Sequence, residues 1–158
     1  MGRNRLAAVL VLSVLVAVSA AAQDIPTISV ENGFDLGYNL ATNNIGSAFH
    51  ISVAVGLTDR LQGEFDFVTG DGTANFQNYR LLGLNYAIVP RFGACVEVGQ
   101  NITAAVAVAG IGLYANLFER NVQGSLQAGL KLRVDYIAPT TGFANGLVRI
   151  GTSVTVGM

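Results

Sequence analysis

The stretch that decides the fold is GSLQAGLKLRVDY, residues 124–136. Every second residue from Leu126 onward is apolar, and the residues between them include Lys131, Arg133 and Asp135. This two-residue period is that of a β-strand with one apolar face and one charged face. In a soluble sheet the charged face meets water, whereas in a membrane barrel the apolar face meets lipid and the charges point inward. The rest of the sequence has to decide between these two arrangements.

The first 22 residues predict a secretory signal peptide that is cleaved after Ala22. Arg3 and Arg5 precede an apolar stretch over residues 6–20, and alanines 20–22 provide small residues at a cut site. A retained membrane anchor is the alternative, but the stretch falls short of the ~20 apolar residues that a spanning helix needs. We therefore expect a signal peptide at 1–22 and one β-barrel domain at 23–158.

The composition of the expected mature chain is unusual for a soluble domain. Removing the leader leaves seven of the nine basic residues and all ten acidic ones, a formal net charge of −3, which gives no electrostatic basis for binding nucleic acid. Charged residues are thus about one in eight, against roughly a quarter in soluble domains. The single cysteine, Cys95, excludes an internal disulfide. Such a low charge in an exported chain favours a surface that is covered by something other than water.

Eight alternating segments follow the leader, each 9 to 15 residues long. Soluble strands typically have ~5–6 residues, whereas strands that cross a membrane have ~9–11. One segment, 103–117, is almost entirely apolar, and periodicity alone does not separate it from a buried helix, but its glycines and valines disfavour a helix interior. The expected strands are Thr27–Ala41, Ser47–Leu57, Leu61–Thr69, Phe76–Ile88, Phe92–Gln100, Thr103–Leu117, Gly124–Tyr136 and Gly146–Met158.

The connections between these segments alternate in length. Tight turns are expected at 58–60, 89–91 and 118–121, and longer loops at 42–46, 70–75 and 137–145, while the short link at 101–102 breaks the trend. Outer-membrane barrels have short periplasmic turns and longer external loops. An even number of strands then places both termini on the periplasmic side.

The ionisable residues lie on the face opposite the aliphatic and aromatic ones in each segment. Arg80 is the exception, and either a bulge at Leu81–Leu82 or a position near the membrane boundary would explain it. Aromatic residues of the apolar face gather toward strand ends, as in the belts of membrane barrels: Tyr38, Phe49, Phe67, Phe76 and Tyr136 at the loop end, Tyr86 and Phe92 at the turn end. The pattern predicts an eight-stranded antiparallel up-and-down transmembrane β-barrel. A soluble sandwich or lipocalin-like barrel with its charges outside is the alternative.

An eight-stranded barrel has an interior that side chains just fill, and buried charges must be paired. The sequence therefore predicts an ion network across the lumen, centred on Lys131, Arg133 and Arg149. Closure makes the first and last strands neighbours, so Asp35 and Arg149 should lie within reach of each other. The full expected network is Asp35, Glu64, Asp66, Glu97, Lys131, Arg133 and Arg149.

The final segment, GLVRIGTSVTVGM, resembles the C-terminal signal that the barrel-assembly machinery reads, although Met158 stands where such proteins usually have an aromatic residue. Over residues 27–158 the architecture resembles the small eight-stranded outer-membrane barrels: the OmpA transmembrane domain, OmpX and the OmpW-like proteins. The pattern does not resolve the subfamily. The resemblance implies a bacterial outer-membrane location, with membrane lipid and the assembly machinery as partners.

Catalytic patterns are weak in this sequence. Some outer-membrane barrels are lipid A acyltransferases or deacylases, and His50 lies near Ser47 and Ser52, but a histidine of the lumen is the simpler interpretation. The spacing Gly110, Gly112 and Ala115 partly matches a dinucleotide fingerprint, which requires a helix that the following residues do not indicate. We expect no catalytic residue, no metal and no cofactor.

The expected function is a non-enzymatic outer-membrane barrel with a structural or surface-interaction role. An OmpW-like narrow transporter of small hydrophobic solutes is the first alternative, and a soluble periplasmic or secreted β-barrel that binds a ligand is the second. The ligand-binding residues are not indicated by the sequence.

Overall fold

The computed structural model describes residues 27–72, 76–123 and 126–158, so the expected signal peptide at 1–22 lies outside the described residues. No helix of the described part is long and apolar enough to cross a membrane. Within the described residues, the fold consists of eight strands and one short 3₁₀ helix, η1. Their bounds are β1 Ile28–Asn39, β2 Asn44–Gly56, β3 Leu61–Gly70, β4 Tyr79–Val89, β5 Phe92–Asn101, β6 Val106–Gln123, β7 Leu126–Pro139, η1 Phe143–Asn145 and β8 Leu147–Gly157.

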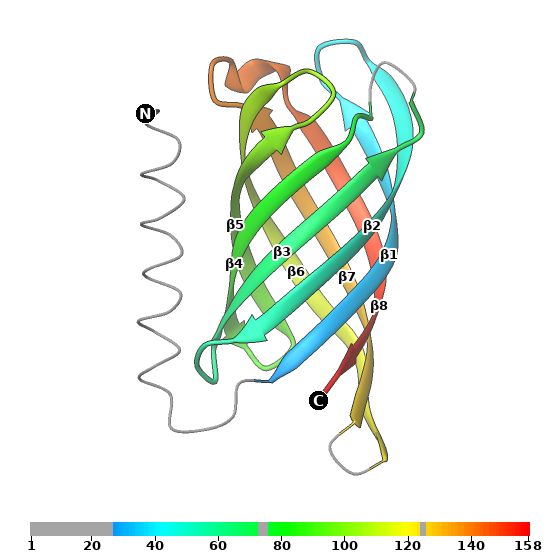
Figure 1. Cartoon of the computed structure of the whole chain (residues 1–158), viewed down its shortest axis with the longest axis vertical. Helices are drawn as coiled ribbons and strands as arrows, with labels where there is room; N and C mark the ends of the chain where they lie inside the picture. The colour runs from blue at the N-terminus through cyan, green and yellow to red at the C-terminus, as the bar shows by residue number, and fades with distance from the viewer. Residues whose placement is uncertain (1–26, 73–75, 124–125) are drawn as a thin grey trace.

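The strands form one closed antiparallel barrel in which each pairs with its neighbours in sequence (Figure 1). Strand β1 closes the barrel by pairing with β8, in a register that runs from Ser29 opposite Gly157 to Asn39 opposite Leu147. Closure removes the sheet edges along the body of the barrel and pairs the backbone groups there, as a hydrocarbon environment requires. The expected fold class, an eight-stranded up-and-down barrel, is confirmed.

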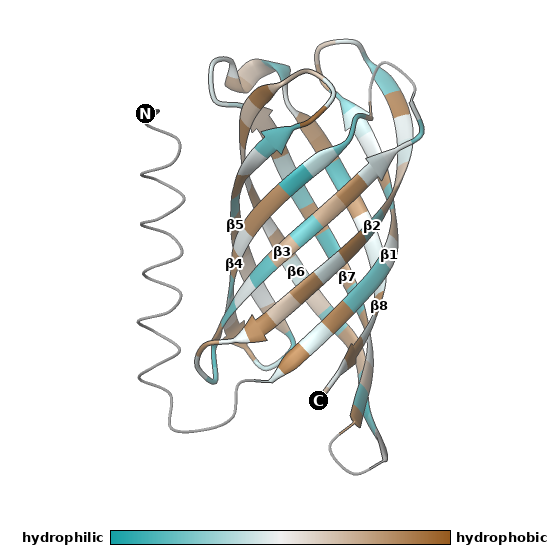
Figure 2. Cartoon of the chain, in the orientation of Figure 1, coloured by the Kyte–Doolittle hydropathy of each residue, from teal (hydrophilic) through white to brown (hydrophobic). Residues whose placement is uncertain are grey.

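The two faces of the wall follow the period of two that the sequence shows. In β1, residues alternate strictly between exposed and buried from Ile28 to Tyr38. Large apolar residues such as Phe34, Ile111 and Leu113 lie outside, each more than half exposed, and Figure 2 shows the apolar and polar bands alternating along the strands. The outside of the barrel is thus apolar and the inside carries the charges, the reverse of a soluble sheet.

Strand β6 is longer than the sequence indicated. It has 18 residues, and residues 118–121, expected as a tight turn, are part of it. Strand β5 pairs with β6 only as far as Ala115, opposite Phe92, whereas β6 and β7 remain paired as far as Gln123 and Leu126. Register shifts after Asn116 and after Asn121 accompany this extension. The β6–β7 hairpin therefore projects past the rest of the turn end (Figure 1).

Two further expectations about side-chain direction are resolved by the structure. The register of β3 with β4 is continuous through Leu81 and Leu82, so the bulge, one of the two explanations for Arg80, is wrong. Arg80 is simply exposed on the outside near the loop end of β4, with its guanidinium 5.9 Å from the centre of the Phe67 ring. Phe76, expected in the outer aromatic belt, is instead fully buried inside the barrel, because the chain before β4 turns inward.

Candidate functional site

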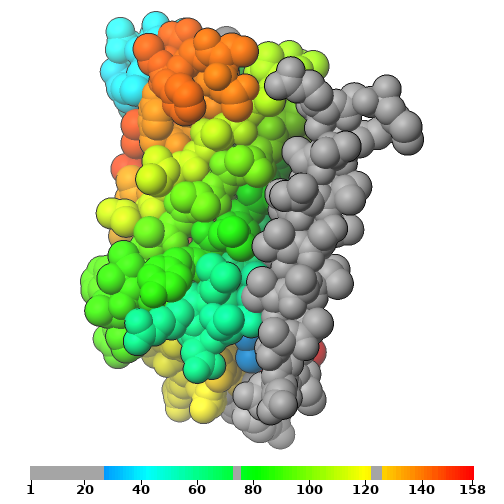
Figure 3. All heavy atoms as spheres, turned by 90° about the vertical axis from the view of Figure 1, so that its left-hand side faces the viewer, coloured from blue at the N-terminus to red at the C-terminus, as the bar shows by residue number. Residues whose placement is uncertain are grey.

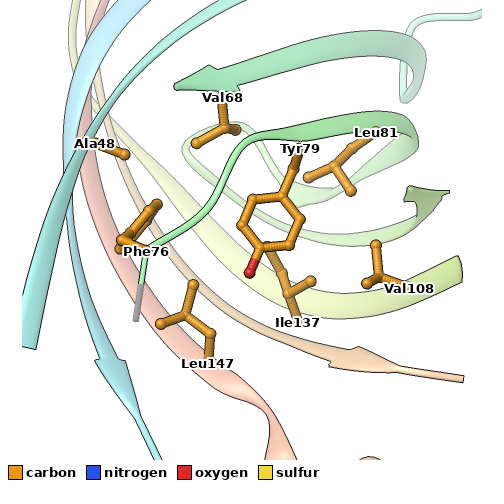
Figure 4. Packing of buried hydrophobic residues seen from close by; sticks show 8 residues of the cluster. All are labelled: Ala48, Val68, Phe76, Tyr79, Leu81, Val108, Ile137 and Leu147. Carbon is orange, nitrogen blue, oxygen red and sulfur yellow. The ribbon is translucent and has the colours of Figure 1, made fainter. Parts of the chain in front are cut away.

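The lumen is the candidate site, and its contents form three layers along the barrel axis. The first layer, at the loop end, is an apolar cap (Figure 4). The side chains of the cap come from β2, β3, β4, β6, β7, β8 and the segment before β4. They are Ala48, Val68, Phe76, Tyr79, Leu81, Val108, Ile137 and Leu147, and all are buried.

Phe76 and Tyr79 supply the two aromatic rings of this cap. Its ring lies at a right angle to that of Tyr79, with 6.5 Å between the two ring centres. A Cβ atom at Gly37 would lie 2.1 Å from the Phe76 ring, so only glycine leaves room for the ring against β1. The Phe76 side chain is fully buried and packs inside the barrel with the other residues of the cap.

The second layer is a connected network of ion pairs in the middle of the barrel. Lys131 donates to Glu31 at 2.8 Å and lies 3.8 Å from Glu64. Arg133 donates to Glu64 at 3.0 Å and also pairs with Glu97. These contacts join β1, β3, β5 and β7 across the lumen.

Arg149 is the hub of the same network nearer to the loop end. Its guanidinium lies 2.7 Å from Asp135, 2.9 Å from Asp66, 3.5 Å from Glu97 and 3.7 Å from Asp35. Only 2% of Arg149 is exposed. One arginine on β8 therefore faces carboxylates from β1, β3, β5 and β7.

Asp135 and Glu97 each contact both Arg133 and Arg149 and so link the halves of the network. Asp135 accepts hydrogen bonds from Arg133 Nε at 2.8 Å and from Arg149 Nε at 2.9 Å. Gly112 stands opposite it on β6, and a Cβ there would lie 2.0 Å from an Asp135 oxygen and 2.6 Å from the Val134 carbonyl oxygen. The approach of the two strands at this carboxylate thus requires glycine.

Acidic groups outnumber basic ones among the described buried residues of the lumen. Six carboxylates face three permanent cations and His50, whose Nδ1 lies 2.9 Å from an oxygen of Asp35. Each cation therefore has two or more acidic neighbours, which is the condition under which a buried cation is best compensated. The acids are Glu31, Asp35, Glu64, Asp66, Glu97 and Asp135.

The third layer, at the turn end, is an open polar vestibule of about 190 Å³. Its walls include Ser29, Gln62 and Thr155, and the Lys131–Glu31 pair lies at its inner end. The Lys131 ammonium also lies 5.1 Å from the centre of the Tyr114 ring. The vestibule therefore extends inward as far as Glu31 and Lys131, where the ion network fills the lumen.

The structure places all seven expected network residues in the lumen, and ion pairs join every one of them to at least one other. Three further members, Glu31, His50 and Asp135, belong to the same network. Their position on the charged face of the strands was evident from the two-residue period. Their partners were not, because cross-lumen distances depend on the register of all eight strands.

The serines that the sequence places near His50 form no charge relay with it. The hydrogen bond of the His50 side chain goes to Asp35, and the Ser47 hydroxyl donates to Asp71 at 3.1 Å. The buried Ser52 hydroxyl has no hydrogen-bond partner among the described residues. A nucleophile needs a base within hydrogen-bond reach, and these contacts do not provide one.

In the described part of the chain, no group of three or more His, Cys, Asp or Glu residues is arranged to hold a metal ion. The Cys95 thiol is buried and donates to Asp135 at 3.2 Å. The partial dinucleotide spacing lies within strand β6 rather than at a strand-to-helix turn.

Comparison with known proteins identifies the fold. No protein-family model and no curated protein sequence match the chain. The crystal structure of Neisserial surface protein A (NspA) is similar over 84% of this chain and 96% of its own, with 11% identity and a TM-score of 0.51. A de novo designed transmembrane β-barrel shares 16% identity over 82% of this chain and 95% of its own, with a TM-score of 0.48.

A second designed barrel, TMB2.3, solved by solution NMR, shares 16% identity over 85% of this chain and 96% of its own, with a TM-score of 0.45. At these identities the similarity to NspA concerns the fold, and the OmpA, OmpX or OmpW-like subfamily stays a prediction. The chain has the fold of a small eight-stranded transmembrane β-barrel.

Proposed function

We propose that this protein is a non-enzymatic barrel of the bacterial outer membrane, with a structural or surface-interaction role. The observation that carries the proposal is the reversed polarity of a closed barrel: residues such as Phe34, Ile111 and Leu113 are outside and Arg149 is inside. In water this outer face would be one continuous apolar surface, far larger than soluble monomers expose. In a bilayer the same face contacts the acyl chains of the lipids, and its exposure there carries little free-energy cost.

The lumen supports a structural role over a transport role. The apolar cap and the ion network fill its outer and middle layers, and an eight-stranded barrel has no further space for a water-filled pore. A surface role would then fall to the loops at the end that carries η1. Membrane lipid and, through β8, the barrel-assembly machinery are the partners we propose.

The location and orientation can be tested together. In cells, the protein should fractionate with the outer membrane and remain there after urea washing. It should also migrate faster on an SDS gel when unheated, because a closed barrel resists SDS. A tag within residues 140–145 should be accessible on intact cells, whereas a tag at Arg60 should be accessible only after permeabilisation. Recovery in the soluble periplasmic fraction would contradict the membrane proposal, and the opposite labelling pattern would contradict the orientation alone.

Conductance separates the structural role from the transporter alternative. In planar bilayers we expect the purified barrel to give no sustained single-channel steps, because the apolar cap around Phe76 packs the loop end of the lumen and the Arg149 network fills the middle. Liposomes that contain the barrel should be no more permeable to small hydrophobic solutes than liposomes without it. Reproducible channel steps or solute flux would favour the OmpW-like alternative.

A further inference from the structure

A second polar cavity lies at the turn end of the barrel, beside the vestibule, and shares Asn116, Glu119 and Gln127 with it. This turn-end notch has a volume of about 360 Å³ and lies between the β4–β5 turn and the part of β6 that extends past β5. Figure 3 shows the two sides as the green β4–β5 turn and, below it, the yellow end of the β6–β7 hairpin. Its lining residues are Arg91, Asn116, Glu119, Arg120, Asn121 and Gln127.

The backbone fixes the two sides of the notch relative to each other. The amide of Asn116 donates to the carbonyl of Arg91 at 2.8 Å, which ties β6 to the turn where the β5 pairing ends. On the other side, Asn121 is paired with Gln127 in the β6–β7 hairpin. The notch is therefore built from paired backbone rather than from mobile side chains alone.

The notch begins where the apolar outer face ends. Phe92, immediately after Arg91, is 59% exposed, and Leu117 and Phe118 on β6 are 52% and 55% exposed. These three exposed apolar side chains lie beside the notch, since Phe92 follows Arg91 in the chain and Leu117 and Phe118 lie between Asn116 and Glu119. If the barrel spans a membrane, as proposed above, the notch lies at the level of the lipid head groups, which border the ~30 Å hydrocarbon core.

The charges in the notch match a zwitterionic head group. Arg91, Arg120 and Glu119 are exposed, and none of the three forms an ion pair with another residue in the described part of the chain. Arginine is suited to bind phosphate oxygens through two parallel hydrogen bonds, and a carboxylate suits an ammonium group. The amides of Asn116, Asn121 and Gln127 add neutral donors and acceptors around them.

We propose that the turn-end notch binds the phosphoethanolamine-type head group of a membrane phospholipid. Arg91 and Arg120 hold the phosphate, and Glu119 holds the ammonium. The acyl chains run along the outer wall past Phe92 and Leu117, which is why a lipid fits better than a soluble phosphate ester. This inference rests on the proposed membrane location, and it names a specific lipid partner for the turn-end leaflet.

Native mass spectrometry of the barrel in detergent micelles tests the proposal with 1-palmitoyl-2-oleoylphosphatidylethanolamine as the probe. Wild type should retain one lipid per barrel. The double variant Arg91→Ala/Arg120→Ala should bind it about tenfold more weakly or worse, since each arginine supplies charge-assisted hydrogen bonds. Arg60→Ala is the matched control, because Arg60 is an exposed arginine of the same end that does not line the notch. Glu119→Gln should remove any preference over phosphatidylglycerol while phosphate binding persists.

Three results would overturn the proposal. The double variant could bind like wild type, diacylglycerol with the same acyl chains could bind as well as the phospholipid, or soluble glycerophosphoethanolamine could bind as tightly as the whole lipid. The last result would assign the notch to a soluble phosphate ester. Membrane association is measured separately, for wild type and for each variant, by flotation of the protein with lipid vesicles in a density gradient. Wild type that fails to float contradicts the membrane proposal, whereas variants that float but bind lipid unchanged contradict only the notch assignment.

Discussion

Arg149→Ala should be among the most destabilising single substitutions in this barrel. The side chain is 2% exposed and lies within 3.7 Å of four carboxylates, so its removal leaves Asp135, Asp66, Asp35 and Glu97 facing one another without their shared cation. Removing one partner of a buried pair typically costs about 3–5 kcal/mol. We expect a loss of that size in the free energy of unfolding, measured by urea titration in detergent. Arg133→Ala should behave similarly, since Arg133 contacts Glu64, Glu97 and Asp135.

Arg80→Ala is the matched control for this prediction. Arg80 is also an arginine of a strand, but it is exposed on the outer face beside Phe67, and such surface changes usually alter stability by less than about 0.5 kcal/mol. Arg149→Lys should fall between wild type and Arg149→Ala, because lysine keeps the charge but offers fewer and less directed donors. If Arg149→Ala and Arg133→Ala unfold like wild type while the outward Leu130→Ala does not, the charged face is on the outside and the membrane barrel fails as an interpretation.

Phe76→Ala should be comparably destabilising for a different reason. The Phe76 side chain is fully buried in the apolar cap, and truncating a buried Phe to Ala usually costs about 3–5 kcal/mol through lost contacts and the cavity left behind. The cavity would lie between the loop end and the ion network. Because the network still fills the layer below, we expect this variant to remain non-conducting in planar bilayers despite its lower stability.

Phe143→Ala is the control for Phe76→Ala. Phe143 lies at the same end on η1 and is 62% exposed, so its truncation removes little packing. The two variants should differ clearly in their urea midpoints. Equal midpoints would show that Phe76 does not pack inside the barrel and that the loop end of the lumen is open.

The sequence by itself determined the wall of this barrel. A period of two determines which side chains share a face, and the long segments predicted the eight strands in their observed order, with ends displaced by at most three residues except at the end of β6. The inward position of Lys131, Arg133 and Arg149 follows from the same period, because a strand places alternate residues on opposite sides regardless of what surrounds it. These are local properties of the chain, so a single sequence carries them.

The tertiary structure decided what the period could not. Phe76 belongs to a segment before β4 rather than to a strand, so the two-residue period does not determine the direction of its side chain. The ring packs inside the barrel against Gly37, which has no side chain to exclude it. Past Ala115, β6 pairs with β7 alone. Residues 118–121 include two adjacent charged residues, so their sequence indicates a turn rather than the continuation of a strand. Likewise, Arg149 has four acidic neighbours only because closure sets the register of β1, β3, β5 and β7 around it. Such contacts join residues that are distant in the chain. The sequence determines which face of its strand each residue lies on, but not its position along the barrel axis, because that position depends on the register of the other strands.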